Sequence, residues 1–307
     1  MPLEMPEVSP LLANRATRST TDRHQPNEPL AVELMRQHVL SQLSQFRLRF
    51  NAGQRIPPLM VAVQGPQGSG KTYLTTRLRD SLAAAPHALS VAVLSIDDLY
   101  LPHDGLVALA QANPDNGLLR GRGQPGTHDV PLGSAILHKL KHINDSGSEE
   151  VILPRFDKSL HGGEGDRVPE GTAVQPPLDV VIFEGWCTGF YPVSAEELDR
   201  RWAAPVPDLG ENFFQARGFR KEDVVDVNSR LKEYVEWWEQ FDTFIQVCLL
   251  AEYLFIGPAE CSNATDQARD VSSVFSHIQV ASAARTPHEV AEWRTRHVGR
   301  TGYLVSN

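Results

Sequence analysis

A glycine-rich segment that directly follows a short apolar run is the feature that most constrains the fold of this chain. Leu59–Val63 is apolar, and residues 65–72 read GPQGSGKT, which fits the pattern G-x-x-x-x-G-K-[ST]. Such a loop needs glycines where a Cβ would keep backbone N–H groups from converging on phosphate oxygens at the positive end of a helix. Lys71 would neutralise the β- and γ-phosphates, and the Thr72 hydroxyl would bind Mg²⁺. The residues expected to bind the nucleotide are Gly65, Pro66, Gln67, Gly68, Ser69, Gly70, Lys71 and Thr72.

Further apolar runs alternate with amphipathic segments along the chain. The runs 91–96, 178–183 and 244–250 predict three more strands, and helical spacing predicts helices at 31–50, 72–82, 132–143 and 225–240. Apolar strands without alternation, separated by helices, are typical of a parallel sheet that is covered on both faces. We therefore expect an α/β fold of three layers, with a mainly parallel central sheet and a P-loop after its first strand.

Charge and composition limit the partners of the chain. The net charge of -9 gives no electrostatic reason to expect nucleic acid or an anionic membrane as a partner. No apolar stretch approaches the roughly 20 residues needed to span a bilayer. The three cysteines form no C-x-x-C pair, and the N-terminal residues lack the apolar core of a signal peptide. We expect a cytoplasmic protein whose anionic ligand is held by a local cluster of donors.

Acidic residues follow two of the predicted strands. Asp97 and Asp98 end the strand after the glycine-rich loop, which we expect beside the first strand in a doubly wound order. Ligands bind beyond the carboxyl ends of such strands, so Asp97 would take a proton from a substrate hydroxyl or hold the metal through water. A helix cap is the alternative role for Asp97. Glu184 is the acidic residue expected to face the magnesium of the P-loop, with an arginine partner as its alternative role.

Two segments, 101–131 and 154–177, are rich in Gly, Pro, Asp, His and Arg, and we expect them to be long polar loops at the rim of the site. Their basic clustering within an acidic chain favours an anionic ligand, either the triphosphate or a carboxylate substrate, although a solvated loop is the alternative. Asp129 is also expected to cap a helix with Pro131 in its first turn. The candidate substrate residues are Asp98, Arg122, His128, Asp129, Arg155, Lys158 and Arg167. None of the histidines is assigned to a metal.

These motifs together resemble plant-type D-glycerate 3-kinase and its fungal homologues, ATP-dependent kinases of the P-loop group that includes phosphoribulokinase, uridine kinase and pantothenate kinase. The resemblance covers roughly residues 57–250 and is carried by GPQGSGKT, SIDDLY at 95–100, RGQPGTHD at 122–129, PRFDKS at 154–159, GEGDR at 163–167 and FEGW at 183–186. It implies a P-loop kinase fold that uses MgATP, with Asp97 as the general base. It also implies that the RGQPGTHD and PRFDKS loops form the acceptor side.

The C-terminal segment departs from the family pattern. The family continues with a helix carrying Trp-Arg and then Gln-Glu, whereas Trp293-Arg294 is the only Trp-Arg pair here and no Gln-Glu follows it. We expect a disordered tail over residues 1–30, a P-loop kinase domain over 31–250 and an atypical segment over 251–307. That last segment is either divergent or a gene-model artefact, such as a retained intron or a frameshift.

The function that we expect is transfer of the γ-phosphoryl group of MgATP to a hydroxyl of a small molecule, with D-glycerate as the favoured acceptor. Lys71 and Asp97 are the expected catalytic residues, and Thr72 and Glu184 the metal ligands. Two alternatives stay open: a kinase for a nucleoside or pantothenate-like acceptor, and a nucleotide-binding protein without turnover. A GTP switch is disfavoured because the chain contains no N-K-x-D guanine motif.

Overall fold

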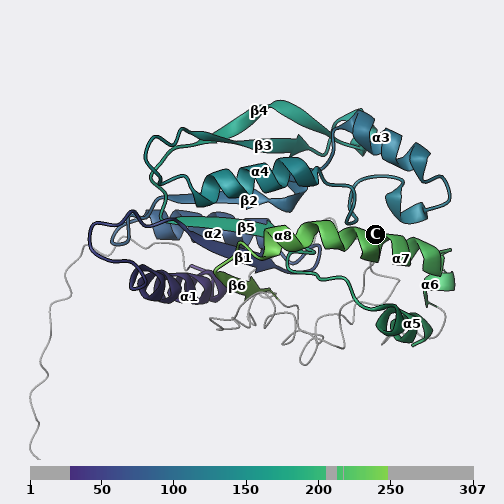
Figure 1. Ribbon diagram of the computed structural model, residues 1–307, viewed down its shortest axis with the longest axis horizontal. Coiled ribbons are helices and arrows are strands. Elements are labelled where there is room, and N and C mark those ends of the chain that lie inside the picture. Colours follow the sequence, from purple (N-terminus) through teal and green to yellow (C-terminus); the bar gives the residue numbers. More distant parts are fainter. Residues whose placement is uncertain (1–27, 205–212, 217, 248–307) are drawn as a thin grey trace, which may run out of the picture.

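The computed structural model describes residues 28–204, 213–216 and 218–247, and within them four parallel strands form the central sheet (Figure 1). These strands are β1 (Leu59–Gln64), β2 (Val91–Ser95), β5 (Val180–Gly185) and β6 (Thr243–Gln246). The predicted α/β fold with a parallel sheet is confirmed. The predicted tail up to residue 27, the end of the fourth apolar run after residue 247 and the atypical segment 251–307 lie outside the described residues.

The strands are arranged in the order β2-β5-β1-β6, so the expectation that β2 lies beside β1 is wrong. The chain runs from β1 through helix α2 (Lys71–Ala83) to β2 and leaves a position between these two strands. This position is filled by β5, which comes later in the chain. As a result Glu184 of β5 is aligned with Val63 of β1 on one side and with Ser95 of β2 on the other. The acidic residue predicted to face the P-loop therefore lies in the middle of the sheet edge.

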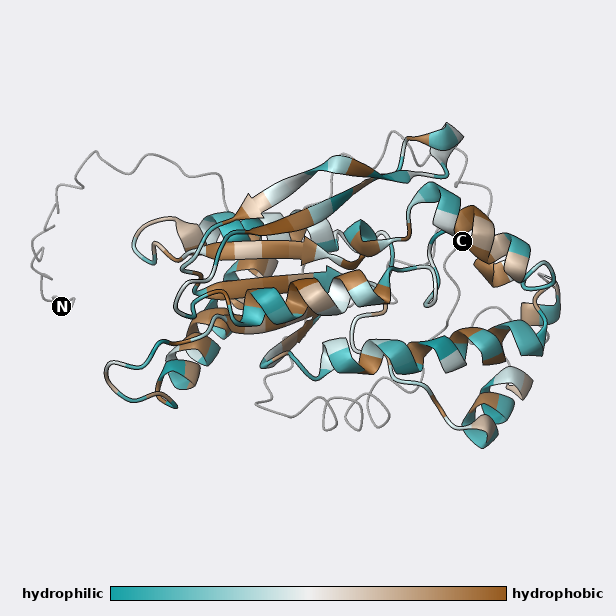
Figure 2. Cartoon of the chain, turned by 45° about the horizontal axis from the view of Figure 1, so that its top comes forward, coloured by the Kyte–Doolittle hydropathy of each residue, from teal (hydrophilic) through white to brown (hydrophobic). Residues whose placement is uncertain are grey.

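Helices cover both faces of the sheet, which gives the predicted three layers. On one face, the strand residues Leu59, Val61 and Ile182 pack in one core with α1 (Leu30–Arg47) and α2. On the other face, the alternate residues Met60 and Phe183 pack in a second core with α4 (Val130–Lys141) and α8 (Val235–Trp238). Burying apolar residues on both faces explains why the strand sequences do not alternate with polar residues. Figure 2 shows these central strands as the most hydrophobic part of the chain.

The remaining helical elements are short and lie mostly around the carboxyl end of the sheet. The predicted helix 225–240 is divided into α7 (Lys221–Arg230), the 3₁₀ turn η4 (Leu231–Tyr234) and α8. No helix among the described residues combines the length and apolarity that crossing a bilayer requires. The others are α3 (His103–Ala112), α5 (Ala195–Ala203), α6 (Phe213–Ala216) and the 3₁₀ turns η1 (Ile96–Leu99), η2 (Gly117–Leu119) and η3 (His161–Gly163).

The two segments predicted to be long polar loops contain regular structure, so that expectation is wrong in part. Helix α3 lies in the first, and an antiparallel hairpin of β3 (Val151–Asp157) and β4 (Asp166–Val174) begins before the second and includes most of it. Pro154 sits within β3 at a register irregularity, between the paired residues Leu153 and Arg155. The strand β4 is largely exposed, so it shows no buried apolar run. The hairpin packs against α4 and η1 and carries the PRFDKS motif toward the site (Figure 1).

Candidate active site

The loop between β1 and α2 depends on its glycines for two different reasons. Gly68 and Gly70 adopt φ angles of +75° and +76°, in the left-handed region that favours glycine. At Gly65 space is limiting, because a Cβ there would lie 2.9 Å from the Ser69 hydroxyl. Gly70 also precedes the first residue of α2, so the free N–H groups of that helix open into the loop. The geometry is that of an anion-binding cradle.

Lys71 lies within this cradle and is 7% exposed. Its ammonium group donates a hydrogen bond to the Pro66 carbonyl at 2.9 Å. Burial lowers the pKa of Lys71, while the negative charges of Glu184 and Asp97 oppose that effect. The two carboxylates predicted from different strand ends therefore both act on the P-loop lysine.

The Thr72 hydroxyl donates to Glu184 Oε1 at 3.0 Å, which joins the start of α2 to the end of β5. Glu184 is 3% exposed, and burial raises its pKa although hydrogen bonds from Ser95 and Thr72 act in the opposite direction. A hydroxyl and a carboxylate side by side at a phosphate-binding loop fit Mg²⁺, which takes one or two protein oxygens and completes its shell with phosphates and water. No cluster of three or more His, Cys, Asp or Glu residues suited to a metal occurs among the described residues, so a cage made of protein side chains alone is not present there.

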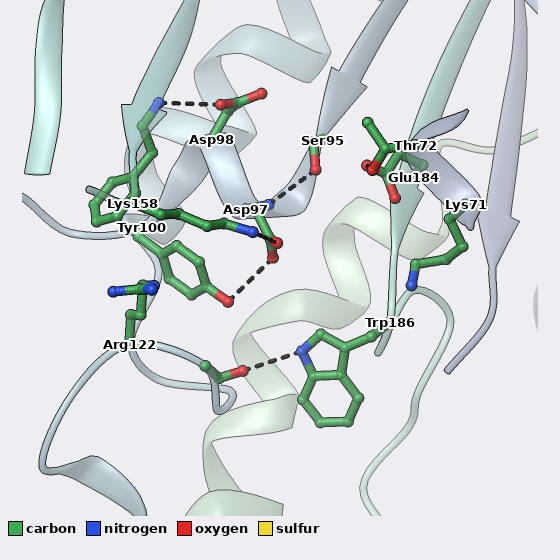
Figure 3. Close-up of polar contacts among 12 residues, drawn as sticks. Lys71, Thr72, Ser95, Asp97, Asp98, Tyr100, Arg122, Lys158, Glu184 and Trp186 are labelled. Atoms are coloured by element: carbon green, nitrogen blue, oxygen red, sulfur yellow. Dashed lines mark hydrogen bonds and ion pairs between the residues drawn. The ribbon is translucent and has the colours of Figure 1, made fainter. Parts of the chain in front are cut away.

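Asp97 lies in the turn η1, directly after β2. Its backbone N–H donates to the Ser95 hydroxyl at 3.3 Å, which starts the turn. Its two carboxylate oxygens accept hydrogen bonds from Tyr100 at 3.1 Å and from Lys158 at 2.6 Å. Figure 3 shows this group on one side of the strand ends, with Lys71, Thr72 and Glu184 on the other. The arrangement leaves a carboxylate facing the phosphate loop across the sheet edge.

The neighbouring Asp98 has a different environment. Its carboxylate accepts the backbone N–H of Phe156 at 3.0 Å, and burial raises its pKa. Figure 3 shows its side chain directed to the backbone of β3. Asp98 therefore ties η1 to the hairpin.

Arg167 and Asp129, both predicted to bind substrate, bind each other. Both terminal nitrogens of Arg167 lie 3.1 Å from Asp129 Oδ2, and one of them also donates to the Tyr100 carbonyl at 2.7 Å. Asp129 caps α4 as expected, because its other oxygen accepts the Leu132 N–H at 3.1 Å. These bonds hold the hairpin, η1 and the start of α4 together.

Arg122 also makes contacts within the protein. It donates to the carbonyl groups of Gly163, at 2.6 Å, and of Glu164, both at the tip of the hairpin. Its guanidinium group lies 6.0 Å from the centre of the Phe156 ring. Arg155 is exposed on β3, so Arg155 and Lys158 are the predicted acceptor-side cations that remain open to solvent.

His128 is buried behind Tyr100 and stacks on it, with ring centres 4.4 Å apart. The Tyr234 hydroxyl accepts the Gly126 N–H at 2.8 Å and is hydrogen-bonded to His128 Nδ1, also at 2.8 Å. Burial lowers the pKa of His128 to about 4, so its ring is neutral at physiological pH. Its Nε2 is buried without a hydrogen-bond partner in the described part of the chain.

Several residues that shape the site were missing from the sequence prediction. They are Ser95, Tyr100, Phe156, Trp186 and Tyr234. Four of them stand inside the quoted motifs, so the signal was present, but their roles depend on contacts between segments far apart in the chain. Trp186, for example, donates to the Gly123 carbonyl at 3.0 Å across 63 positions. Tyr234 lies in an ordinary helical pattern, and nothing in that pattern indicated a role in the site.

Comparison with known proteins places this site in a family, although no family model matches the chain. A solved structure described as D-glycerate 3-kinase from Cryptococcus neoformans is 37% identical, with a TM-score of 0.67, and the match covers 87% of this chain and 85% of that one. The D-glycerate 3-kinase, chloroplastic, of Arabidopsis thaliana is 38% identical over 202 residues, which are 65% of this chain and 40% of the relative.

The protein named "Probable ATP-dependent kinase TDA10" of Saccharomyces cerevisiae is 39% identical over 146 residues. That match covers 47% of this chain and 50% of the relative, so the chain spans half or less of these two curated relatives. The match to the Cryptococcus structure extends over most of both chains, and it confirms the resemblance and the P-loop kinase fold. This chain belongs to the D-glycerate 3-kinase family of P-loop kinases.

Proposed function

We propose that the protein is an ATP-dependent kinase that transfers the γ-phosphoryl group of ATP to a hydroxyl of D-glycerate. The observation that carries this proposal is the Asp97 carboxylate, which faces a complete phosphate loop across the carboxyl edge of the sheet. A carboxylate at this position can take the proton of an acceptor hydroxyl, a step that turnover requires and nucleotide binding alone does not. The D-glycerate 3-kinases among the relatives support the choice of acceptor.

On the nucleotide side, the loop amides and Lys71 bind the phosphates. Lys71 now donates to the Pro66 carbonyl, and it would exchange that weak partner for phosphate oxygens. Thr72 and Glu184 would hold Mg²⁺, which when bound neutralises charge on the β- and γ-phosphates. These interactions fix the γ-phosphoryl group in line with the acceptor, which is the main contribution of a protein to this chemistry.

On the acceptor side, Asp97 accepts the proton of the attacking hydroxyl. As the new O–P bond forms, the bond between the γ-phosphorus and its bridging oxygen breaks, and ADP leaves with that oxygen. The proton then passes from Asp97 to solvent. The products are ADP and a phosphate monoester of the acceptor.

The exposed cations near Asp97 favour an anionic acceptor. Lys158 already contacts the Asp97 carboxylate from the turn that follows β3, and Arg155 lies on β3 itself. A hydroxy acid offers a carboxylate for these groups and a hydroxyl for Asp97. We assign Asp98, Arg122, Asp129 and Arg167 to holding the loops around the acceptor, because their contacts lie within the protein.

The Asp97→Asn variant tests this proposal. It keeps the size of the side chain and both neighbouring donors, but it removes the base, so turnover should fall by about 10²- to 10⁴-fold while ATP binding is retained. The matched control is Asp145→Asn, in the exposed turn after α4. Turnover at the wild-type rate in Asp97→Asn would show that Asp97 is not the base.

A further inference from the structure

Each oxygen of the Asp97 carboxylate accepts a hydrogen bond from a neighbouring side chain. Oδ1 accepts the Tyr100 hydroxyl at 3.1 Å, and Oδ2 accepts the Lys158 ammonium group at 2.6 Å. A hydroxyl that gives its proton to this carboxylate must approach next to one of these two donors, and it enters most easily where the donor is held less firmly. The two donors therefore bias which oxygen acts as the base.

The two donors differ in how firmly they are held. Tyr100 is 2% exposed, and its ring is stacked on His128 and meets the edge of Phe156 at a centre-to-centre distance of 5.3 Å. The Lys158 side chain is 54% exposed and belongs to the turn that follows β3. An exposed ion pair contributes only about 0 to 1 kcal/mol, since water competes for both charges. Lys158 is therefore the donor that leaves readily.

Tyr100 is also a donor that does not change its charge. Burial and the neighbouring Asp97 carboxylate raise the pKa of its phenol well above the ordinary value, so the hydroxyl stays protonated. The ring behind it, His128, is held neutral by burial and fixed by the Tyr234 hydroxyl. The support of Tyr100 thus comes from buried groups of the RGQPGTHD loop, β3 and η4.

We propose that Tyr100 is a positioning residue, which fixes Oδ1 of Asp97 so that Oδ2 accepts the proton, and that Lys158 leaves Oδ2 to bind the anionic group of the incoming acceptor. This inference rests on the proposed kinase function and adds to it the role of Tyr100 and the release of Asp97 by Lys158. Lys158 contacts the basic oxygen and, as the acceptor binds, exchanges the carboxylate of Asp97 for the carboxylate of the hydroxy acid. The reacting oxygen thereby becomes available as an anionic acceptor enters.

The two residues should have different kinetic signatures. Tyr100→Phe keeps the ring and its stacking but removes the hydroxyl, so kcat should fall by about 10- to 100-fold while the KM values for ATP and acceptor stay close to those of the wild type. Lys158→Met should instead raise the KM for D-glycerate by about 10-fold or more, and Lys158→Arg should restore most of that loss. Lys139→Met, at an exposed position of α4, is the control for removing a lysine.

A double-mutant cycle distinguishes positioning from a structural effect. If Tyr100 acts through Asp97, Tyr100→Phe should lower turnover by less than about threefold in the Asp97→Asn background. Thermal unfolding of Tyr100→Phe and of Tyr234→Phe, which loses another buried hydroxyl, measures the cost to the fold. Equal losses of turnover from Tyr100→Phe in both backgrounds, or an unchanged kcat in the single variant, would overturn the inference while leaving the kinase function intact. A wild-type protein that phosphorylates no acceptor would overturn both.

Discussion

Thr72 and Glu184 share a hydrogen bond of 3.0 Å that joins the first turn of α2 to the central strand β5. The carboxylate that receives it is almost fully buried, and it carries a charge that the described residues only partly compensate. A buried charge of this kind lowers the stability of the unliganded protein, and a cation bound between the two oxygens would remove the cost. Function and stability are therefore opposed at this position.

The Glu184→Gln variant should be more stable and less active than the wild type. Because burial raises the pKa of Glu184 in the folded state, the ionised form is disfavoured there, and the penalty is present at neutral pH. It declines as the pH falls through the folded-state pKa and vanishes below the ordinary value of 4.5. Without Mg²⁺, the variant should melt at a higher temperature than the wild type at pH 7.5. This difference in melting temperature should disappear near pH 4. Its half-maximal activity should need about 10- to 100-fold more Mg²⁺.

The exposed Glu149→Gln substitution controls for a general change in net charge. A lower melting temperature of Glu184→Gln at pH 7.5 without Mg²⁺ would contradict the role given to burial.

Arg167→Met should lower the free energy of unfolding by about 1.5 to 3 kcal/mol, because it removes charge-assisted hydrogen bonds to Asp129 and to the Tyr100 carbonyl. Asp129→Asn should cost less, since asparagine also caps helices well. The double variant should be less destabilised than the sum of the two single variants, as expected for residues that contact each other. Chemical denaturation measures all three. Unchanged stability combined with a raised KM for the acceptor would instead favour the substrate-binding role expected from the sequence.

His128 should make the stability of the protein depend on pH. Its pKa is about 4 when folded and 6.5 in the unfolded reference, so the unfolded state takes up the proton first and stability is lost as the pH falls below 6.5. The difference corresponds to about 2 kcal/mol between pH 7.5 and pH 5. His128→Gln should flatten the profile by that amount, as measured by urea unfolding at the two pH values. Parallel profiles for the variant and the wild type would show that His128 is not buried in its neutral form.

The phosphate loop and the acidic strand ends could be predicted because they depend on local sequence. The strand-loop-helix pattern around residues 65–72 follows from glycine spacing and an apolar run. The three-layer fold follows from strands in which apolar residues do not alternate with polar ones. The strand order could not be obtained in this way. It depends on which position of the sheet a strand fills, and β5 enters between β1 and β2 from more than 80 residues away.

The acceptor side was harder to predict because charged residues show the same pattern whether they bind a ligand or one another. Arg167 and Asp129 stand 38 positions apart, and nothing in either motif indicates that they form an ion pair. The hairpin that carries Lys158 was hidden by Pro154 within β3 and by the exposed, glycine-containing β4. Tyr100 was quoted within a motif, but its role follows only from its hydrogen bond to Asp97.

Release of ADP from MgATP, measured with and without D-glycerate, tests the central claim most directly. The account predicts release that depends on D-glycerate, saturates with its concentration and yields a phosphorylated hydroxy acid. Asp97→Asn should lower the rate of this release by at least about 100-fold. A nucleoside and pantothenate, tested in the same assay, represent acceptors of other chemistry. Faster turnover of either one would contradict the assignment of D-glycerate, and ATP binding without acceptor-dependent ADP release for any of the three would contradict the kinase function itself.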